Sequence, residues 1–259
     1  MTAPVRLEQL STTQIAGLLA DGADFLILPI GATEQHGPHL PINTDSVIAE
    51  RICLAAAEKT GVPLLPVIAY TVSSGHTAKW PGTFSLGHEA FIASICQIAE
   101  WAGASGWKRL LLVNSHFGND ASLRVVLEKI RLQFFGKLQI GLQHTFLLSP
   151  AIQQYFVSDA EDLHANRAET DLMLHLAPDS VDMTVVEDDP DRTEGTVFSY
   201  PVAQTSLNGI TGSPSLGDAK RGAELFEEMT TALSVVIEKA RTEEPPLPAE
   251  HWAHIPTPL

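Results

Sequence analysis

Short apolar runs and segments of helical periodicity alternate along this chain. Phe25–Ile30 and Arg109–Asn114 are apolar almost throughout and have the length of buried strands. Residues 63–68 and 137–146 are two further strand candidates. Alternation of this kind predicts an α/β fold with a mostly parallel sheet covered by helices. Apolar residues recur at helical spacing over residues 7–19, 45–59, 88–103, 120–134, 168–176 and 218–241.

No linker divides the chain, and we predict a single domain over residues 1–242. Residues 70–87 have no regular period and contain aromatic and histidine side chains, so we expect this long loop to be functional. Residues 243–259 contain five prolines and are expected to form an extended tail. The chemistry of the protein is therefore expected to lie within one α/β domain.

Composition and charge narrow the class of partner. The chain has 259 residues, 44% of them hydrophobic, which is ample for a core. Its formal net charge of −15 disfavours nucleic acids and anionic membrane surfaces. Residues 1–10 do not have the pattern of a secretory signal, and no apolar run has the length of a membrane span. Cys53 and Cys96 lie in helical segments and are expected to be core thiols. A cytoplasmic enzyme acting on a small molecule is the expectation.

Two carboxylates and a histidine follow the first predicted strand. Glu34 and His36 come directly after a glycine turn, and Asp45 begins the next helical segment. Functional groups of open α/β sheets gather beyond the carboxyl ends of the strands. The three side chains could therefore converge on a metal ion. The alternative is a solvated loop with Asp45 as a helix cap, and the glycines and prolines around the motif favour the metal site.

Two further clusters carry histidines. His116 follows the strand Arg109–Asn114, which places it at the same edge of the sheet as Glu34, although it could instead cap the next helix. His164 precedes a helix whose first turn contains Glu169. An imidazole beside a metal-activated water is a usual general acid or base near neutral pH. The helix dipole alone also favours an acid in a first turn, so a structural role is open for Glu169.

The motifs that are missing also limit the chemistry. The chain has no Gly-x-Ser-x-Gly elbow, no P-loop sequence and no Gly-x-Gly-x-x-Gly after a strand. These absences argue against a serine hydrolase, a nucleoside triphosphatase and a Rossmann dehydrogenase. Carboxylate and histidine ligands without cysteine favour zinc, manganese or ferrous iron.

Together the clusters resemble the creatininase (creatinine amidohydrolase) family. This resemblance implies a single three-layer α/β/α domain with a mostly parallel central sheet, a homohexamer and a dinuclear metal centre. The family hydrolyses C–N bonds of small cyclic or formylated amides. The residues that carry the resemblance are 34–41 with Asp45, Trp80-Pro81-Gly82-Thr83, Asn114-Ser115-His116, His164 with Glu169-Thr170, and the turn at 208–212.

The resemblance assigns roles to individual residues. Glu34 and His116 would bind one divalent ion, and His36 would bind the other. Asp45 would bridge the two ions. His164 would be the catalytic histidine near the leaving group.

The same resemblance suggests a substrate pocket. Ser74 matches a position that contacts substrate, and Phe117 stands where creatininase has a tyrosine. His76 and Trp80 are expected to shape the same pocket. The tryptophan–aspartate pair that covers creatinine falls on residues 160–161, which are Ala-Glu here, so creatinine itself is not the expected substrate.

One metal ligand of creatininase has no counterpart at its own position. The family's enzyme has a glutamate two residues after the histidine that matches His116, and this chain has Gly118 there. We predict that Glu169 supplies the missing carboxylate and is, with His164, a catalytic residue. Asp120, or a water molecule in the vacant position, is the alternative.

These assignments predict a metal-dependent amidohydrolase that cleaves a small cyclic or formyl amide with a metal-bound hydroxide. Two divalent ions per chain, Zn²⁺ first and Mn²⁺ or Fe²⁺ as alternatives, would bring the pKa of a bridging water to about neutral. A lactone or ester hydrolase that uses the same site is the alternative enzyme. A non-catalytic member of the fold is the third hypothesis.

Overall fold

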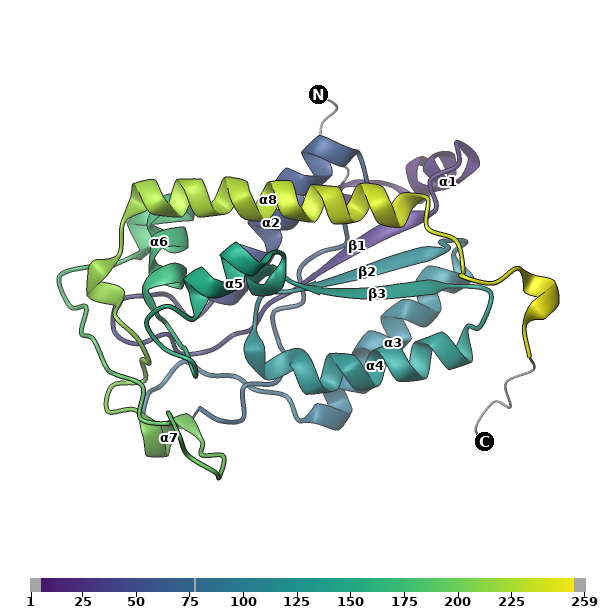
Figure 1. The fold of residues 1–259 in the computed structure, drawn as a ribbon. Helices are drawn as coiled ribbons and strands as arrows, with labels where there is room; N and C mark the ends of the chain where they lie inside the picture. Colours follow the sequence, from purple (N-terminus) through teal and green to yellow (C-terminus); the bar gives the residue numbers. More distant parts are fainter. Residues whose placement is uncertain (1–5, 77, 254–259) are drawn as a thin grey trace.

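Three parallel strands form the central sheet of the computed structural model, which describes residues 6–76 and 78–253 (Figure 1). They are β1 (Phe25–Ile30), β2 (Arg109–Asn114) and β3 (Gln139–His144), and they are hydrogen-bonded in the order β1-β2-β3. The register aligns the last residues of all three strands, Ile30, Asn114 and His144. Every residue of β1 is buried, which explains its unbroken apolar run.

Residues 63–68 lie along the outer edge of β1 without forming a regular strand. Isolated parallel bridges join Leu64 to Ile27 and Ile68 to Ile30. On this side of β1, Ile27 and Gly31 donate to the carbonyls of Pro63 and Ile68. Pro29 lies between these two donors and has no N–H group, so the ladder is broken there. The strand predicted over these residues is therefore an interrupted edge.

Helices cover both faces of the sheet, and this confirms the predicted three-layer α/β/α fold (Figure 1). Each face has its own buried core: one includes Ile27 and Val113, and the other includes Leu26 and Leu112. The first core is covered by α2 (Thr44–Thr60), α5 (Pro150–Phe156), α6 (Arg167–Leu176) and α8 (Ala219–Arg241). The second is covered by α1 (Thr12–Ala20), α3 (His88–Ala104) and α4 (Asp120–Gln133).

The predicted helices from 45–59 onward agree with α2, α3, α4, α6 and α8 to within one residue at each end. The first predicted helix is divided, because Ser11 caps α1 in a reciprocal capping box with Gln14. The short helix α7 (Val202–Thr205) lies in the long excursion between α6 and α8. Single 3-10 turns occur at Leu7–Gln9, Phe117–Asn119, Thr145–Leu147, Pro178–Ser180, Pro214–Leu216 and Ala249–His251.

The described part of the proline-rich tail returns to the body of the protein. The ring of Trp252 lies 5.2 Å from that of Phe135, just past the end of α4. The boundary at residue 242 stays a prediction. Among the residues described, no helix combines the length and apolarity needed to cross a membrane.

Candidate metal centre

Five predicted metal ligands come together beyond the carboxyl ends of β1 and β2. Two lie in the loop after β1, one in the first turn of α2, one directly after β2 and one in the first turn of α6. All five are buried, although each carries an ionisable side chain. They are Glu34, His36, Asp45, His116 and Glu169, with exposed fractions of 0%, 1%, 2%, 7% and 4%.

A glycine makes this convergence possible. A Cβ atom at Gly31 would lie 2.4 Å from the backbone of Ser46, so only glycine lets the end of β1 approach the start of α2 so closely. The contact brings Asp45 beside the loop that carries Glu34. Asn119 holds the same turn, since its side-chain amide donates to the Gly31 carbonyl at 3.0 Å.

The ligands form two groups that share Asp45. Glu34, Asp45 and His116 each place a ligand atom within 4.8 Å of the others, and so do His36, Asp45 and Glu169. Oδ1 of Asp45 lies 3.4 Å from Nε2 of His36, and Oδ2 lies 3.3 Å from Nδ1 of His116. Asp45 therefore presents a different oxygen to each group, which is the arrangement expected of a bridging carboxylate.

The two histidines of these groups are anchored through their other ring nitrogens. Nδ1 of His36 lies 3.0 Å from the carbonyl of Glu34, and Nε2 of His116 lies 2.8 Å from the carbonyl of Val72. A carbonyl only accepts hydrogen bonds, so each of these nitrogens carries the proton. In the neutral ring that metal binding requires, Nε2 of His36 and Nδ1 of His116 would carry lone pairs directed at Asp45. Histidines that bind metals are commonly oriented by such a hydrogen bond.

Several buried oxygen and nitrogen atoms of these groups have no hydrogen-bond partner. They include both carboxylate oxygens of Glu34, Nε2 of His36, Oδ2 of Asp45 and Oε2 of Glu169. Burying such atoms unpaired is costly, of order 1–3 kcal/mol for each neutral group and more for a charged one. Divalent ions would supply the missing partners, so the residues present fit a dinuclear metal site.

The electrostatics of the site also fit cations. Burial disfavours charge on the rings, but Asp45 raises the pKa of His36 to about 10, and Glu34 with Asp45 raises the pKa of His116 to about 9. Burial raises the pKa of Glu169 to about 7, and this rise is partly offset by His36. The field of the clustered carboxylates that holds protons on the rings would equally attract divalent ions.

The carboxylate of the second group comes from Glu169 and not from position 118. A Cβ atom at Gly118 would lie 2.6 Å from both Nε2 of His116 and the carbonyl of Val72, so this backbone leaves no room for a side chain there. Asp120 is engaged elsewhere, with Arg124 at 2.9 Å and His144 at 2.9 Å. The geometry thus favours Glu169 over Asp120 as the replacement for the missing glutamate.

Gly118→Ala tests this crowding. The added methyl group should displace His116, destabilise the fold by about 1–3 kcal/mol as overpacking does, and weaken binding of the first ion. Thermal unfolding and metal analysis measure the two effects. Gly17→Ala is the matched control, because its Cβ would meet nothing within 4 Å. An equally stable, fully metal-loaded Gly118→Ala protein would contradict the assignment.

His164 lies against the first group. Its Nδ1 lies 3.3 Å from Oε1 of Glu34, and its ring centroid lies 4.5 Å from that of His36. Burial, followed by the neighbouring His36 and His76, holds the pKa of His164 well below its usual value. His164 is therefore a neutral base at neutral pH.

The four predicted substrate-pocket residues occupy different settings. His76 contacts the centre directly, with Nε2 3.0 Å from Oε1 of Glu34. Phe117 is 41% exposed and stacks on Phe146 with ring centroids 3.7 Å apart. Ser74 is exposed, with its hydroxyl 3.4 Å from that of Ser85. Trp80 lies beneath the ammonium group of Lys79, 4.6 Å from the ring centre.

Gln35 has no role predicted from the sequence, although it stands between two predicted ligands. Alternate residues of an extended segment point to opposite sides. Gln35 would therefore point away from the two ligands beside it, and a polar side chain in that position indicates a partner of its own. Gln35 is 3% exposed and its side chain hydrogen-bonds to His76 and Gly209.

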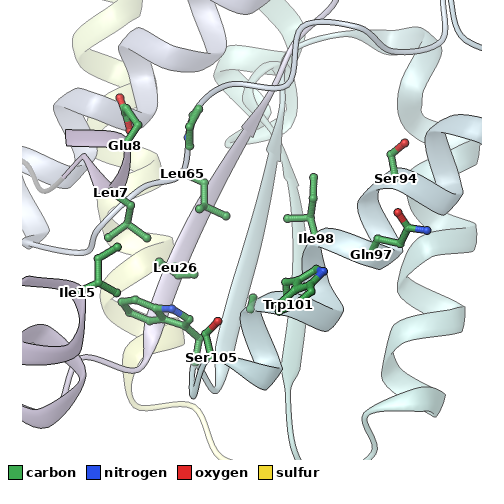
Figure 2. A pocket seen from close by; sticks show the side chains of 13 residues that line it. Leu7, Glu8, Ile15, Leu26, Leu65, Ser94, Gln97, Ile98, Trp101 and Ser105 are labelled. Atoms are coloured by element: carbon green, nitrogen blue, oxygen red, sulfur yellow. The ribbon is translucent and has the colours of Figure 1, made fainter. Parts of the chain in front are cut away.

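An apolar groove of about 670 Å³ lies elsewhere, between the first helical turns of the chain and α3 (Figure 2). Leu7, Ile15, Ile98 and Trp101 are among its lining residues. None of the predicted ligands lines it, so it is separate from the metal centre.

Comparison with known proteins agrees with this geometry. A family model described as "Creatininase: Creatinine amidohydrolase" matches residues 8–237. The chain is 33% identical over 215 residues to the mycofactocin precursor peptide peptidase of Mycolicibacterium smegmatis, covering 79% of this chain and 80% of the relative. It is 28% identical over 263 residues to the creatinine amidohydrolase of Pseudomonas putida, covering 95% and 100%.

A solved structure of a mutant creatininase of the Zn-Zn type superposes on the chain with a TM-score of 0.79. The two share 26% sequence identity, and the match covers 92% of this chain and 98% of that one. Family model, relatives and fold coincide over nearly the whole chain. The chain belongs to the creatininase family of hydrolases.

Proposed function

We propose that this protein is a metal-dependent amidohydrolase that cleaves the C–N bond of a small cyclic or formyl amide. Two divalent ions are part of the proposal, with Zn²⁺ first and Mn²⁺ or Fe²⁺ as alternatives. The main support is the position of Asp45, whose two oxygens face two groups of buried, unpartnered ligand atoms. The similarity to a Zn-Zn creatininase supports the choice of zinc. A homohexamer belongs to the same proposal.

The chain's own groups divide the work around the reacting amide. Glu34, Asp45 and His116 would hold one ion, and His36, Asp45 and Glu169 the other. Ions bound there would supply polarisation of the scissile carbonyl and acidification of a water molecule.

His164 supplies the proton transfer. Its Nε2 lies 2.7 Å from the carbonyl of Gln35, so this nitrogen carries the proton and Nδ1 carries the lone pair. Nδ1 can therefore accept a proton from the attacking water and deliver it to the departing nitrogen. Such acid–base help is worth about 10²–10⁴ in rate.

The residues around the centre would select the substrate. Phe117, the residue after His116, offers a partly exposed ring, and Ser74 and Trp80 belong to the irregular loop that also carries His76. Nε2 of His76 lies 3.0 Å from Oε1 of Glu34, so we assign this ring a role in orienting that carboxylate beside its predicted role in the pocket.

A peptide amide is the second candidate substrate. The specific observation in its favour is the 33% identity to a precursor peptide peptidase over 79% of this chain. A peptide bond and a cyclic amide require the same attack on a carbonyl and the same protonation of nitrogen, so the residue roles above do not change.

A substrate screen tests the proposal. The purified protein is analysed for metal content, stripped with a chelator, and reloaded separately with Zn²⁺, Mn²⁺ and Fe²⁺. Each form is assayed against cyclic amides, formamides, short peptides and lactones. Hydrolysis of a cyclic or formyl amide that disappears on chelation supports the proposal. Activity on lactones alone, or on peptides alone, identifies the alternative hydrolases, and absence of bound metal in the untreated protein argues for a non-catalytic member.

His164→Ala separates catalysis from metal binding. We expect unchanged metal content and turnover lowered on the order of 10²-fold or more, because the general acid–base group is lost. Metal analysis and steady-state kinetics measure both quantities. His251→Ala, in the exposed 3-10 turn of the tail, is the control and should retain full turnover. Parallel loss of metal in His164→Ala would make this histidine a ligand instead.

A further inference from the structure

Gln35 lies between the ligands Glu34 and His36, and its side chain makes three directed contacts. Its Nε2 donates to the carbonyl of Gly209 at 2.9 Å, and its Oε1 accepts from the backbone N–H of Gly37 at 3.0 Å. Exchanging the amide oxygen and nitrogen would break both hydrogen bonds, so the network fixes the orientation of the amide. The second amide hydrogen is then directed at Nδ1 of His76, 2.7 Å away.

This contact determines the tautomer of His76. Because Nδ1 accepts a hydrogen bond from Gln35, the neutral ring carries its proton on Nε2. That nitrogen lies 3.0 Å from Oε1 of Glu34. His76 thus turns an N–H group toward Glu34, where a metal ligand would turn a lone pair. Although Glu34, His76 and His164 are close enough to surround an ion, this proton argues against a third metal site.

The backbone of the same residue determines the tautomer of His164. The carbonyl of Gln35 lies 2.7 Å from Nε2 of His164, which must therefore carry the proton. Nε2 of the Gln35 amide is also 3.2 Å from this nitrogen, but both amide hydrogens are already engaged by Gly209 and His76. Nδ1 of His164 is left with its lone pair on the side of Glu34, at 3.3 Å.

Gln35 also holds the chain segment on which His164 rests. Gly209 has a φ of +86°, and a Cβ atom there would lie 2.4 Å from Oε1 of Gln35, so the turn is shaped to receive this side chain. Two residues later, Thr211 pairs with His164 through both backbone hydrogen bonds, at 3.1 and 2.8 Å. The side chain therefore links the metal-binding loop to the turn that fixes His164.

We propose that Gln35 is a positioning residue that sets the proton pattern of the centre, directing the N–H group of His76 toward Glu34 and leaving Nδ1 of His164 as the free base. The catalytic consequence rests on the proposed function, whereas the proton pattern itself does not. Residues that orient groups around a metal centre typically account for about 10–100-fold in activity or metal affinity.

Nitrogen NMR of the histidine rings tests the proposal directly. The zinc-loaded protein is labelled with ¹⁵N in its histidines, and resonances of His76 and His164 are assigned by substituting each in turn. The expected spectrum has the proton on Nε2 and a lone pair on Nδ1 in both rings. A spectrum with the His76 proton on Nδ1 would overturn the proposal.

Two variants then alter the side chain alone. In Gln35→Glu the carboxylate cannot donate to His76, so its Nδ1 should gain a proton, while His164 should keep its tautomer because the backbone carbonyl remains. Gln35→Met removes the hydrogen bonds without adding a buried charge, and should leave His76 in a mixture of tautomers. This second variant keeps the test intact if the buried glutamate prevents folding. Gln153→Glu, on the exposed face of α5, is the control for charge.

Kinetics completes the test with the amide that the substrate screen identifies. Both variants should lower kcat about 10–100-fold with metal content and KM little changed, since Gln35 is not a ligand. An unaltered His76 tautomer in both variants, or an altered tautomer with unchanged kcat, would overturn the proposal. Failure of the wild-type protein to hydrolyse any amide would instead reject the proposed function, and the proton pattern would then be judged from the spectra alone.

Discussion

Asp45→Ala is expected to lose both metal ions together and to abolish hydrolysis. Each oxygen of this carboxylate faces a histidine of a different ligand group, at 3.4 and 3.3 Å, so neither site is complete without it. Loss of the ions removes several kcal/mol of transition-state stabilisation, which corresponds to on the order of 10³-fold or more in turnover. Elemental analysis of the purified variant gives the stoichiometry, and circular dichroism shows that it is folded.

Asp120→Ala is the matched control for this experiment. Asp120 also begins a helix beyond the carboxyl end of a strand, but its carboxylate is paired with Arg124 and His144. The Asp120→Ala protein should therefore keep both ions. Retention of one fully occupied metal site in Asp45→Ala would contradict the bridging role, and loss of an ion in Asp120→Ala would show that the second site takes its carboxylate from α4.

Glu169→Gln is expected to weaken the second ion selectively. The substitution keeps the shape of the side chain and removes the negative charge that Glu169 contributes to its group with His36 and Asp45. Since a four-ligand zinc site is worth about 10–16 kcal/mol, the loss of one ligand should lower affinity on the order of 10²-fold. Most of the activity should disappear and return in part with excess metal. Titration of the chelator-treated protein, followed by calorimetry, measures the two affinities.

The competing account of Glu169 is a purely structural acid at a helix start. In that case only about 0.3–1 kcal/mol of stability would be lost and activity would remain. Glu89→Gln is the control, because Glu89 occupies the first turn of α3 and is exposed. A metal-loaded, active and slightly destabilised Glu169→Gln protein, matching Glu89→Gln, would reject the ligand role.

The metal-free forms give an independent reading of the same site. Burial raises the pKa of Glu169 to about 7. In the protein without ions, the negative charge of this side chain therefore contributes little to folding stability. Glu169→Gln should therefore leave the stability of the metal-free protein within about 1 kcal/mol of wild type. If Glu169 had a purely structural role, its substitution would lower the stability of the metal-free protein most. If Glu169 is a ligand, the substitution lowers stability only when metal is present.

Local pattern was sufficient for most of the fold. The unbroken apolar residues of β1 and β2 can be buried only in a sheet covered on both faces. Helical spacing predicted α2, α3, α4, α6 and α8, because each of those helices buries one stripe. Local pattern failed at residues 63–68, where apolar content predicted a regular strand. There Pro29 of β1 lacks the N–H group that a continuous ladder with these residues requires.

The order of residues along the chain was enough to identify the side chains that could make a metal centre. Glu34, His36 and His116 follow strands directly, and parallel strands end at one edge, so their meeting follows from chain order. Their protonation and their division between two ligand groups depend on contacts between distant segments. Gln35 and His164 are 129 positions apart, and the proton on His164 depends on a carbonyl that no local pattern places there. Whether position 118 or position 169 supplies a carboxylate likewise depends on backbone crowding beside Val72, because space is set by packing between distant segments and not by residue order.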